Sequence, residues 1–90
     1  MKIKIDDIEV ELTDIVRIDA YKVDLLTFDE IRFDISLNDT IISISEEHPN
    51  FNYIDNVFSQ NMVGYESNWR KKVTFPAFAE NRLTVYNLDF

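Results

Sequence analysis

Carboxylates are the most numerous reactive groups in this sequence, with 17 Asp and Glu among 90 residues. Six of them stand near the ends and corners of predicted strands: Asp19, Asp24, Asp29, Glu30, Glu46 and Glu47. Carboxylate oxygens are preferred ligands of hard cations such as Ca²⁺, so convergence of these groups would make a cation site. Their spacing does not match an EF-hand loop, which also needs a fixed glycine. We therefore expect a solvated acidic surface and no metal site, and a hydrolase with paired carboxylates in one cleft is a weaker alternative.

Other groups that could catalyse a reaction are scarce. The single histidine, His48, precedes a proline and is expected to be a solvated turn residue, since one His cannot form a two-histidine metal site. The single glycine excludes the known nucleotide-binding loops, which need more than one. The absence of cysteine excludes disulfides, cysteine-ligated zinc and thiol catalysis. We expect no catalytic residue and no cofactor. A small enzyme of unknown reaction is therefore the third hypothesis for function, after the two non-enzymatic hypotheses given below.

Negative charge is unevenly distributed along the chain. Residues 1–55 contain 14 acidic and 5 basic residues, whereas residues 56–90 contain 3 acidic and 4 basic residues. Nucleic acid binding depends on Lys and Arg that neutralise phosphates, so neither nucleic acid nor an anionic membrane is expected as a partner. A basic protein would be attracted. The alternative, that the charge serves only solubility, stays open.

Acidic residues and one aromatic residue are the candidates for contacting such a partner. The predicted partner-binding residues are Asp24, Asp29, Glu46, Glu47 and Trp69. Most aromatic residues of the stretch 68–86 are expected in the core, and the alternative is that Trp69 or Tyr65 is an exposed anchor, because aromatic residues are enriched in binding hot spots. The only basic run, 70–72, is expected to be solvated or to pair with acidic residues of the same molecule.

Alternation of hydrophobic and polar residues predicts strands in the first half of the chain. The predicted strands cover residues 3–5, 8–12, 16–21, 31–37 and 40–45. Asp6 and Asp7 suit a tight turn between the first two, and Asn38 and Asp39 suit the turn between the last two. The segment 24–30 is expected to be a turn or a helical corner.

A change of the hydrophobic period to 3.6 residues predicts one principal helix near residues 50–62. Its apolar stripe consists of Phe51, Ile54, Val57, Phe58 and Met62. The side chain of Asn50 is expected to cap its first turn, and Gly64 is expected to adopt the left-handed conformation of a C-terminal cap. A short second helix is expected to start at Ser67, and a last strand is expected over residues 83–88.

This order of elements predicts a single α+β domain over residues 1–90, with an antiparallel sheet of about four to six strands packed by the principal helix and a final strand at the C-terminus. The predicted core includes Phe33, Ile35, Ile44, Ile54, Phe58, Trp69 and Phe78. With 46% hydrophobic and 13% aromatic residues the chain is not expected to be disordered. The sequence shows neither an apolar run that could span a membrane nor the apolar core of a signal peptide, so a cytoplasmic protein is expected.

Several segments together carry a resemblance. The run AYKVDLLTFDEI at 20–31, the acidic pair at 46–47, and a tail with Gly64, Trp69, Val73, residues 75–78, Asn81 and Thr84 resemble a group of small uncharacterised bacterial proteins. That group looks like a hairpin-rich sheet, an acidic pair, a helix and a tail of the form W-x3-V-x-F-P-A-F-x2-N-x2-T. The resemblance covers roughly residues 15–86 and departs at 59–68, where a Leu-Pro-rich approach to the glycine would be expected. It implies the same fold and no particular activity, and by analogy small acidic domains of this kind are similar to immunity proteins of bacterial toxin systems.

The sequence therefore favours a non-enzymatic acidic binding protein, immunity-like in character, that engages a basic protein partner. The alternative is a structural or assembly subunit that self-associates through an exposed sheet edge or through the region around Trp69. Under that alternative the protein would be a homo-oligomer.

Overall fold

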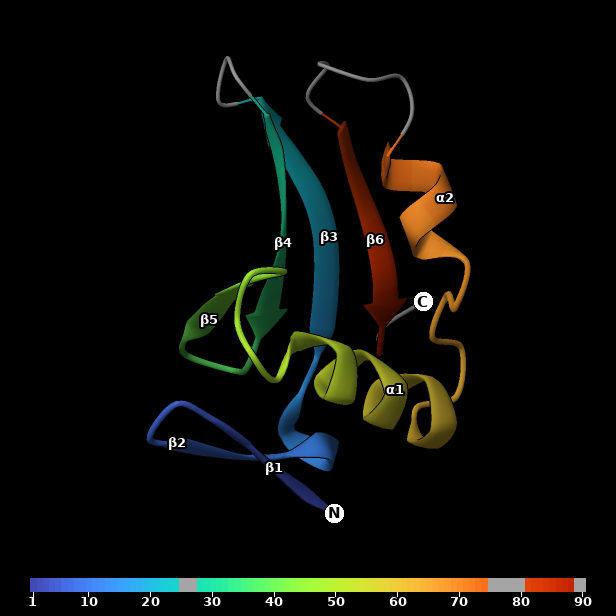
Figure 1. The fold of residues 1–90 in the computed structure, drawn as a ribbon. Coiled ribbons are helices and arrows are strands. Elements are labelled where there is room, and N and C mark those ends of the chain that lie inside the picture. Colours follow the sequence, from blue (N-terminus) through green and yellow to red (C-terminus); the bar gives the residue numbers. More distant parts are fainter. Residues whose placement is uncertain (25–27, 75–80, 89–90) are drawn as a thin grey trace.

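Two antiparallel sheets and two helices form the part of the protein that the computed structural model describes, residues 1–24, 28–74 and 81–88 (Figure 1). In chain order the elements are β1 (Lys2–Ile5), β2 (Ile8–Glu11), the 3₁₀ turn η1 (Leu12–Asp14), β3 (Arg17–Asp24), β4 (Asp29–Ser36), β5 (Ile41–Ser45), α1 (Phe51–Asn61), α2 (Trp69–Thr74) and β6 (Asn81–Asn87). The predicted α+β fold is confirmed, with a four-stranded antiparallel sheet, one main helix and a final strand near the C-terminus.

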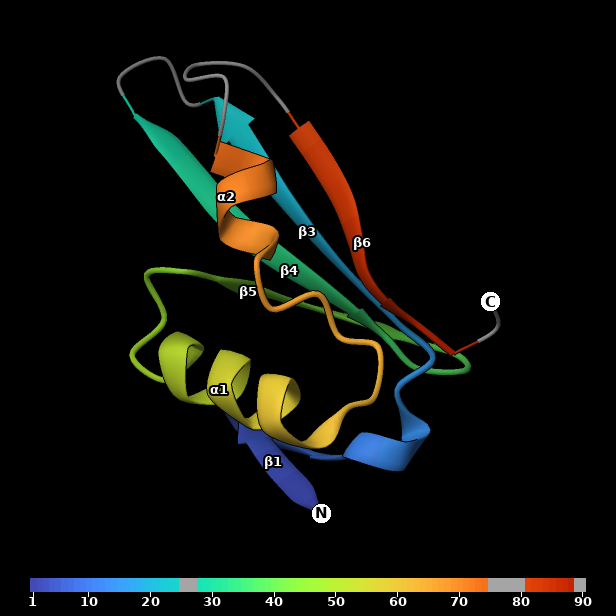
Figure 2. The ribbon, with the colours of Figure 1, turned by 90° about the vertical axis from the view of Figure 1, so that its right-hand side faces the viewer.

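The larger sheet has the strand order β5-β4-β3-β6, and all neighbouring strands are antiparallel. The register sets Ile18 opposite Ile35 and Ala20 opposite Phe33. Because side chains alternate between the two faces of a strand, these pairs collect apolar residues on one face. Both helices lie over that face, and no described element lies over the other (Figure 2).

Aromatic rings form the centre of the core. The ring centroid of Phe33 lies 4.7 Å from that of Phe51 and 4.8 Å from that of Trp69, in tilted and edge-on contacts that add to the burial of apolar area. Six predicted core residues are buried as expected: Phe33, Ile35, Ile44, Ile54, Phe58 and Trp69. The seventh, Phe78, lies outside the described residues.

The β1–β2 hairpin closes one end of the core, below α1 in Figure 1. Ile5 pairs with Ile8, so the turn contains only Asp6 and Asp7, as predicted. Asp6 has a φ of 54°, in the left-handed region that Asp tolerates better than most residues. The hairpin contributes Ile3 and other buried side chains to the same core as the larger sheet.

The start of α1 is organised by His48 and not by the Asn50 side chain. Asn50 occupies the N-cap position, but its side chain forms no capping hydrogen bond, so that prediction is wrong. The backbone N–H of Asn50 instead donates to Nδ1 of His48 at 3.0 Å, and Nε2 of His48 lies 2.8 Å from Oδ1 of Asp6. His48 is therefore a half-buried link between the hairpin and α1, whereas a solvated turn residue was expected.

Gly64 follows the end of α1 in a tight turn. Its φ of 87° confirms the predicted left-handed conformation. The helix ends at Asn61, however, and the next residue, Met62, is extended. The carbonyl of Met62 accepts a hydrogen bond from the N–H of Tyr65 at 3.2 Å, so Gly64 serves the third position of a turn after the helix, where a positive φ is needed.

The connection between β3 and β4 is shorter than the sequence predicted. Asp24 still belongs to β3 and pairs with Asp29, the first residue of β4, so the expected turn or helical corner over 24–30 is wrong at both ends. Residues 25–27 lie outside the described residues. In the described ranges neither helix combines the length and apolar character that crossing a membrane requires.

Candidate interaction surface

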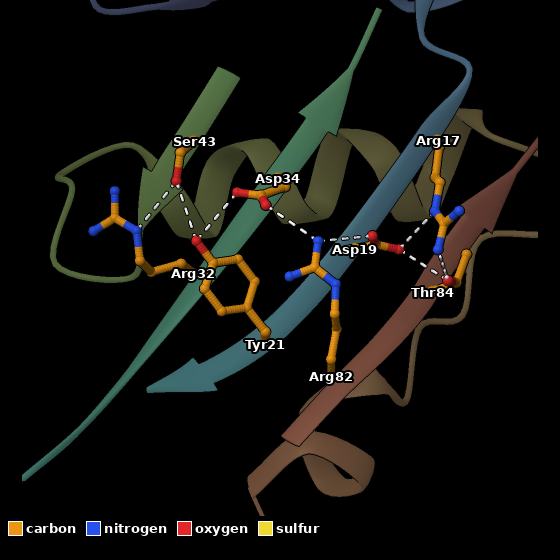
Figure 3. A network of polar contacts seen from close by, with 8 residues as sticks. All are labelled: Arg17, Asp19, Tyr21, Arg32, Asp34, Ser43, Arg82 and Thr84. Carbon is orange, nitrogen blue, oxygen red and sulfur yellow. Dashed lines mark hydrogen bonds and ion pairs between the residues drawn. The ribbon is translucent and has the colours of Figure 1, made fainter. Parts of the chain in front are cut away.

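The uncovered face of the larger sheet carries a continuous polar network, the sheet-face network (Figure 3). Its members come from all four strands: Arg17, Asp19 and Tyr21 from β3, Arg32 and Asp34 from β4, Ser43 from β5, and Arg82 and Thr84 from β6. The register produces the arrangement, because Asp19 lies opposite Asp34 on one side and opposite Thr84 on the other. Residues far apart in sequence therefore meet on one surface.

Asp19 is the central anion of this network and is only 6% exposed. Its Oδ1 accepts hydrogen bonds from Nε of Arg17 at 3.0 Å and from the hydroxyl of Thr84 at 2.8 Å, and its Oδ2 accepts one from Nη2 of Arg82 at 2.9 Å. Burial by itself would raise the pKa of Asp19, but these hydrogen bonds outweigh burial and hold the pKa below its ordinary value. The carboxylate is therefore ionised at neutral pH.

Arg82 extends the network from β6 towards β4. Its Nη2 also donates to Oδ2 of Asp34 at 3.2 Å, and its guanidinium carbon lies 4.8 Å from the centre of the Tyr21 ring. The Tyr21 hydroxyl donates in turn to Oδ1 of Asp34 at 3.2 Å. Burial would lower the pKa of Arg82, but the hydrogen bonds to the two carboxylates raise it above its ordinary value. These contacts fix the guanidinium in one position on the sheet.

Arg32 continues the contacts to the β5 side. Its Nε donates to the hydroxyl of Ser43 at 3.2 Å, and its Nη1 donates to Glu30 at 3.0 Å. The other oxygen of Glu30 accepts a hydrogen bond from the hydroxyl of Ser45 at 3.2 Å. Polar contacts thus cross the whole sheet from β6 to β5.

Positive and negative charges balance on this face. The ion pairs join Arg17, Arg32 and Arg82 with Asp19, Glu30 and Asp34. Asp19 and Glu30, which were expected on a solvated acidic surface, are instead paired with arginines of the same or a neighbouring strand. The excess of negative charge in the chain must therefore lie elsewhere.

Asp24 and Asp29, two of the predicted partner-binding residues, lie opposite each other at one end of the sheet. A carboxylate oxygen of Asp29 lies 3.6 Å from Nζ of Lys22, which also donates to the carbonyl of Thr74 at 2.6 Å. Lys22 is 2% exposed, and a buried ammonium group needs such partners. Asp29 thus takes part in an internal ion pair.

Glu46 and Glu47 follow β5 near the same end of the sheet. The N–H of Glu46 donates to the carbonyl of Ile31, which is two residues from Asp29 along β4. The Glu46 carboxylate accepts a hydrogen bond from Nη1 of Arg70 at 3.2 Å. Part of the basic run 70–72 therefore pairs with an acidic residue of the same molecule, which was one of its two predicted roles. Glu47 is exposed and forms no ion pair with any described residue.

Trp69, the fifth predicted partner-binding residue, lies in the core and is 1% exposed. Its Nε1 donates to Oδ1 of Asp55 at 3.0 Å, and the hydroxyl of buried Tyr65 donates to the same oxygen at 2.6 Å. The guanidinium carbon of Arg70 lies 4.7 Å from the centre of the indole ring. The prediction that Trp69 is in the core is confirmed, and Phe75 and Phe78 of the same stretch lie outside the described residues. Because Tyr65 is buried as well, an exposed anchor at either Trp69 or Tyr65 is excluded.

Asp55 is the important residue of this region that the sequence analysis missed. It receives hydrogen bonds from the α1–α2 connection and from α2, and so ties both to α1. Burial raises the pKa of the Tyr65 hydroxyl, and the hydrogen bond to the Asp55 carboxylate raises it further. Asp55 directly follows Ile54 and precedes Phe58 by three positions, so it lies at the border of the apolar stripe. This position is the sequence feature that could have identified it.

Exposed carboxylates without a basic partner are found in the turns. Those that form no ion pair with a described residue are Asp7, Asp14, Asp39 and Glu47. The contact between Asp6 and His48 brings the β1–β2 turn, with Asp7, close to the turn that carries Glu47. We call the two turns that carry Asp6, Asp7 and Glu47 the acidic turns. Asp14 and Asp39 line a separate shallow hollow.

Comparison with known proteins identifies no relative. No family model, no curated protein and no solved structure matches this chain. The resemblance to small bacterial proteins stays a prediction. Among the described residues no group of three or more His, Cys, Asp or Glu could hold a metal ion.

Proposed function

We propose that this protein is a non-enzymatic acidic binding domain that engages a basic protein partner. The observation that carries the proposal is the contrast between two sets of carboxylates. Those of the sheet face are neutralised by arginines, whereas Asp7 and Glu47 project from neighbouring turns without a Lys or Arg partner among the described residues. With a net charge of −8 on the chain, these groups would attract a basic surface and speed its encounter.

Glu47 is the first contact that we assign to the partner. Glu46 precedes it directly, and the pair Asp24 and Asp29 lies near the same end of the sheet, so these three residues form the rest of the proposed surface. Asp29 and Glu46 already have basic partners within the molecule, and a basic partner would compete with Lys22 and Arg70 for them. An immunity-like role, the binding of a basic toxin domain, is the form of this function that we favour, because it needs only an acidic surface of fixed shape.

Two double variants with equal charge change test the proposal. A partner is first isolated by affinity capture, and its association rate is then measured at low and high salt. Replacing Asp7 and Glu47 by their amides is expected to slow association markedly and to reduce its salt dependence, because screening acts on exposed charges over a Debye length of about 10 Å at 0.1 M and about 3 Å at 1 M. Replacing Asp14 and Asp39 by asparagine removes the same charge elsewhere and is expected to have a smaller effect.

The amide variant of Asp24, Asp29 and Glu46 tests the remainder of the surface. It is expected to slow association less per charge than the Asp7 and Glu47 variant, since two of its carboxylates are already paired. Capture that returns no basic protein, or equal association rates for the wild type and all three variants, would show that the proposal is wrong.

A further inference from the structure

The two edges of the larger sheet are protected to different degrees. On β6, the carbonyl of Val85 accepts a hydrogen bond at 2.8 Å from the N–H of Glu66, in the α1–α2 connection, and the pairing of β6 with β3 shifts register beside Ile18 and Asp19. Covering segments and bulges of this kind block association between sheet edges. In the described structure β5 pairs only with β4, and its sequence, IISIS, contains no charged residue and no proline.

The register identifies the backbone groups on the outer side of β5. The N–H of Glu46 bonds to the carbonyl of Ile31 in β4. In an antiparallel pair, every second residue of a strand forms hydrogen bonds to the neighbouring strand. Because Glu46 does so, the N–H and C=O groups of the even-numbered residues of β5 point towards β4. The N–H and C=O groups of Ile41 and Ser43 therefore point away from β4.

These outward groups are complementary to themselves. When two copies of β5 are placed antiparallel with a two-fold axis at Ile42, Ile41 of each copy lies opposite Ser43 of the other. In each of these two pairs the N–H of one residue donates to the carbonyl of the other, as in the hydrogen-bonded pairs of an antiparallel ladder. Each copy therefore supplies two of the hydrogen-bond donors. Both copies use the same patch, as a two-fold interface requires.

The side chains suit the same register. Ile42 is partly buried and packs against the core on the helix-covered face, so the two-fold axis places it beside its own copy and extends the apolar layer. Ile41 is 64% exposed on the opposite face and would be covered in part by the second strand. Isoleucine is among the residues that best stabilise cross-strand pairs.

We propose that β5 is a homodimerisation edge, through which two copies join antiparallel across Ile41–Ser43 into one continuous sheet. The inference does not depend on the proposed function. The net charge of −8 on each chain opposes the association of two copies, so added salt should strengthen the dimer, whereas salt should weaken the binding of a basic partner. A failure of either proposal can therefore be recognised separately.

Sedimentation over a range of protein concentrations, at low and at high salt, measures this equilibrium. Ser43→Pro removes the outward N–H without removing a bond between β4 and β5, and proline is tolerated at such a position of an edge strand. Two of the interface hydrogen bonds are lost in the dimer of this variant, so its dissociation constant should rise by about tenfold or more. Ser43→Ala is the matched control, because it also loses the hydroxyl contacts with Arg32 and Tyr21 but keeps the N–H. It should leave the dissociation constant within about threefold of the wild-type value.

A second pair of variants keeps the test decisive if the proline variant fails to fold. Ile41→Lys places a charge in the edge strand, which should prevent pairing. Ile8→Lys makes the same charge change at an isoleucine that is 50% exposed on β2, and should leave the dimer intact. Slower amide exchange of Ile41 and Ser43 at high protein concentration would locate the interface.

Some outcomes would overturn the proposal. Sedimentation at a single-chain mass, at high concentration and high salt, would show that the protein is not a homodimer. A dimer that is insensitive to both Ser43→Pro and Ile41→Lys would use another surface. If the amides of Ile41 and Ser43 become protected only when the captured partner is added, the edge receives a strand of that partner and the homodimer proposal is wrong.

Discussion

Replacement of Asp19 by asparagine tests the sheet-face network most directly. The change keeps the shape of the side chain but removes the charge that Arg17 and Arg82 contact at 3.0 and 2.9 Å. The amide nitrogen of the variant must face a donor, because donors surround both carboxylate oxygens. Hydrogen bonds to charged groups contribute about 1.5–3 kcal/mol each. The side chains of Arg17 and Arg82 are 49% and 52% exposed, so water compensates part of the loss, and we expect a fall in the free energy of unfolding of about 2 kcal/mol at neutral pH.

The pH dependence of the fall in the free energy of unfolding is a more specific test of the Asp19 charge. The pKa of Asp19 is lower in the folded protein than in the unfolded chain, so the stabilisation is fully present above the ordinary pKa of Asp and disappears as the pH falls through the folded-state pKa. The asparagine variant cannot titrate at this position. The difference in the free energy of unfolding between wild type and variant should therefore be largest near neutral pH and shrink in acid, as measured by urea denaturation across that range.

Asp39→Asn is the matched control for this experiment. Asp39 is exposed and forms no ion pair with a described residue, so its replacement should change the free energy of unfolding by less than about 0.5 kcal/mol. If Asp19→Asn costs no more than Asp39→Asn, the contacts of Asp19 do not stabilise the fold. If the loss at Asp19 stays constant as the pH is lowered, the charge of Asp19 is not the cause of the stabilisation.

Three further predictions follow from the core and the carboxylates. Phe58→Ala should lower the free energy of unfolding by about 3–5 kcal/mol in denaturant titrations, because the fully buried ring leaves a cavity, and a loss below about 1 kcal/mol would contradict its place in the core. Tyr65→Phe removes the hydroxyl that donates to Asp55 and should cost about 1–2 kcal/mol in the same assay, and a neutral effect would mean that this contact adds nothing to stability. Millimolar Ca²⁺ or Mg²⁺ at constant ionic strength should leave the melting temperature unchanged, and a rise of several degrees would show a cation site that we do not expect.

Local patterns were sufficient to predict most of the fold. The alternation that places Phe33 and Ile35 on one side of β4 depends only on the period of a strand, and the stripe that buries Ile54 and Phe58 depends only on the period of a helix. Errors appeared where local rules compete. At the start of α1 the Asn50 side chain was expected to cap the helix, but it forms no capping hydrogen bond. The backbone N–H of Asn50 donates to the His48 ring, which also contacts Asp6, 42 residues away along the chain.

Charge pairing could not be predicted in the same way. Arg82 and Asp19 are 63 positions apart, and they meet only because β6 pairs with β3 in one particular register. A count of acidic residues along the chain gives the sign of the total charge, but strand order decides which carboxylates remain available to a partner. Strand order also decides that β5 is an edge, which no property of the sequence IISIS reveals.

Ionic strength separates the two proposals within one preparation of the protein. Contacts between unlike charges weaken as the Debye length falls, so the complex with a basic partner should dissociate when salt is raised. Repulsion between two chains of net charge −8 weakens in the same way, so pairing at the uncharged β5 strand should become tighter. If both proposals hold, salt converts a mixed complex into homodimers, and the Ile41→Lys variant, which retains Asp7 and Glu47, should still release its partner but no longer dimerise. If the Ile41→Lys variant shows neither salt-induced release of the partner nor salt-induced dimerisation, the edge strand and the acidic turns belong to one surface.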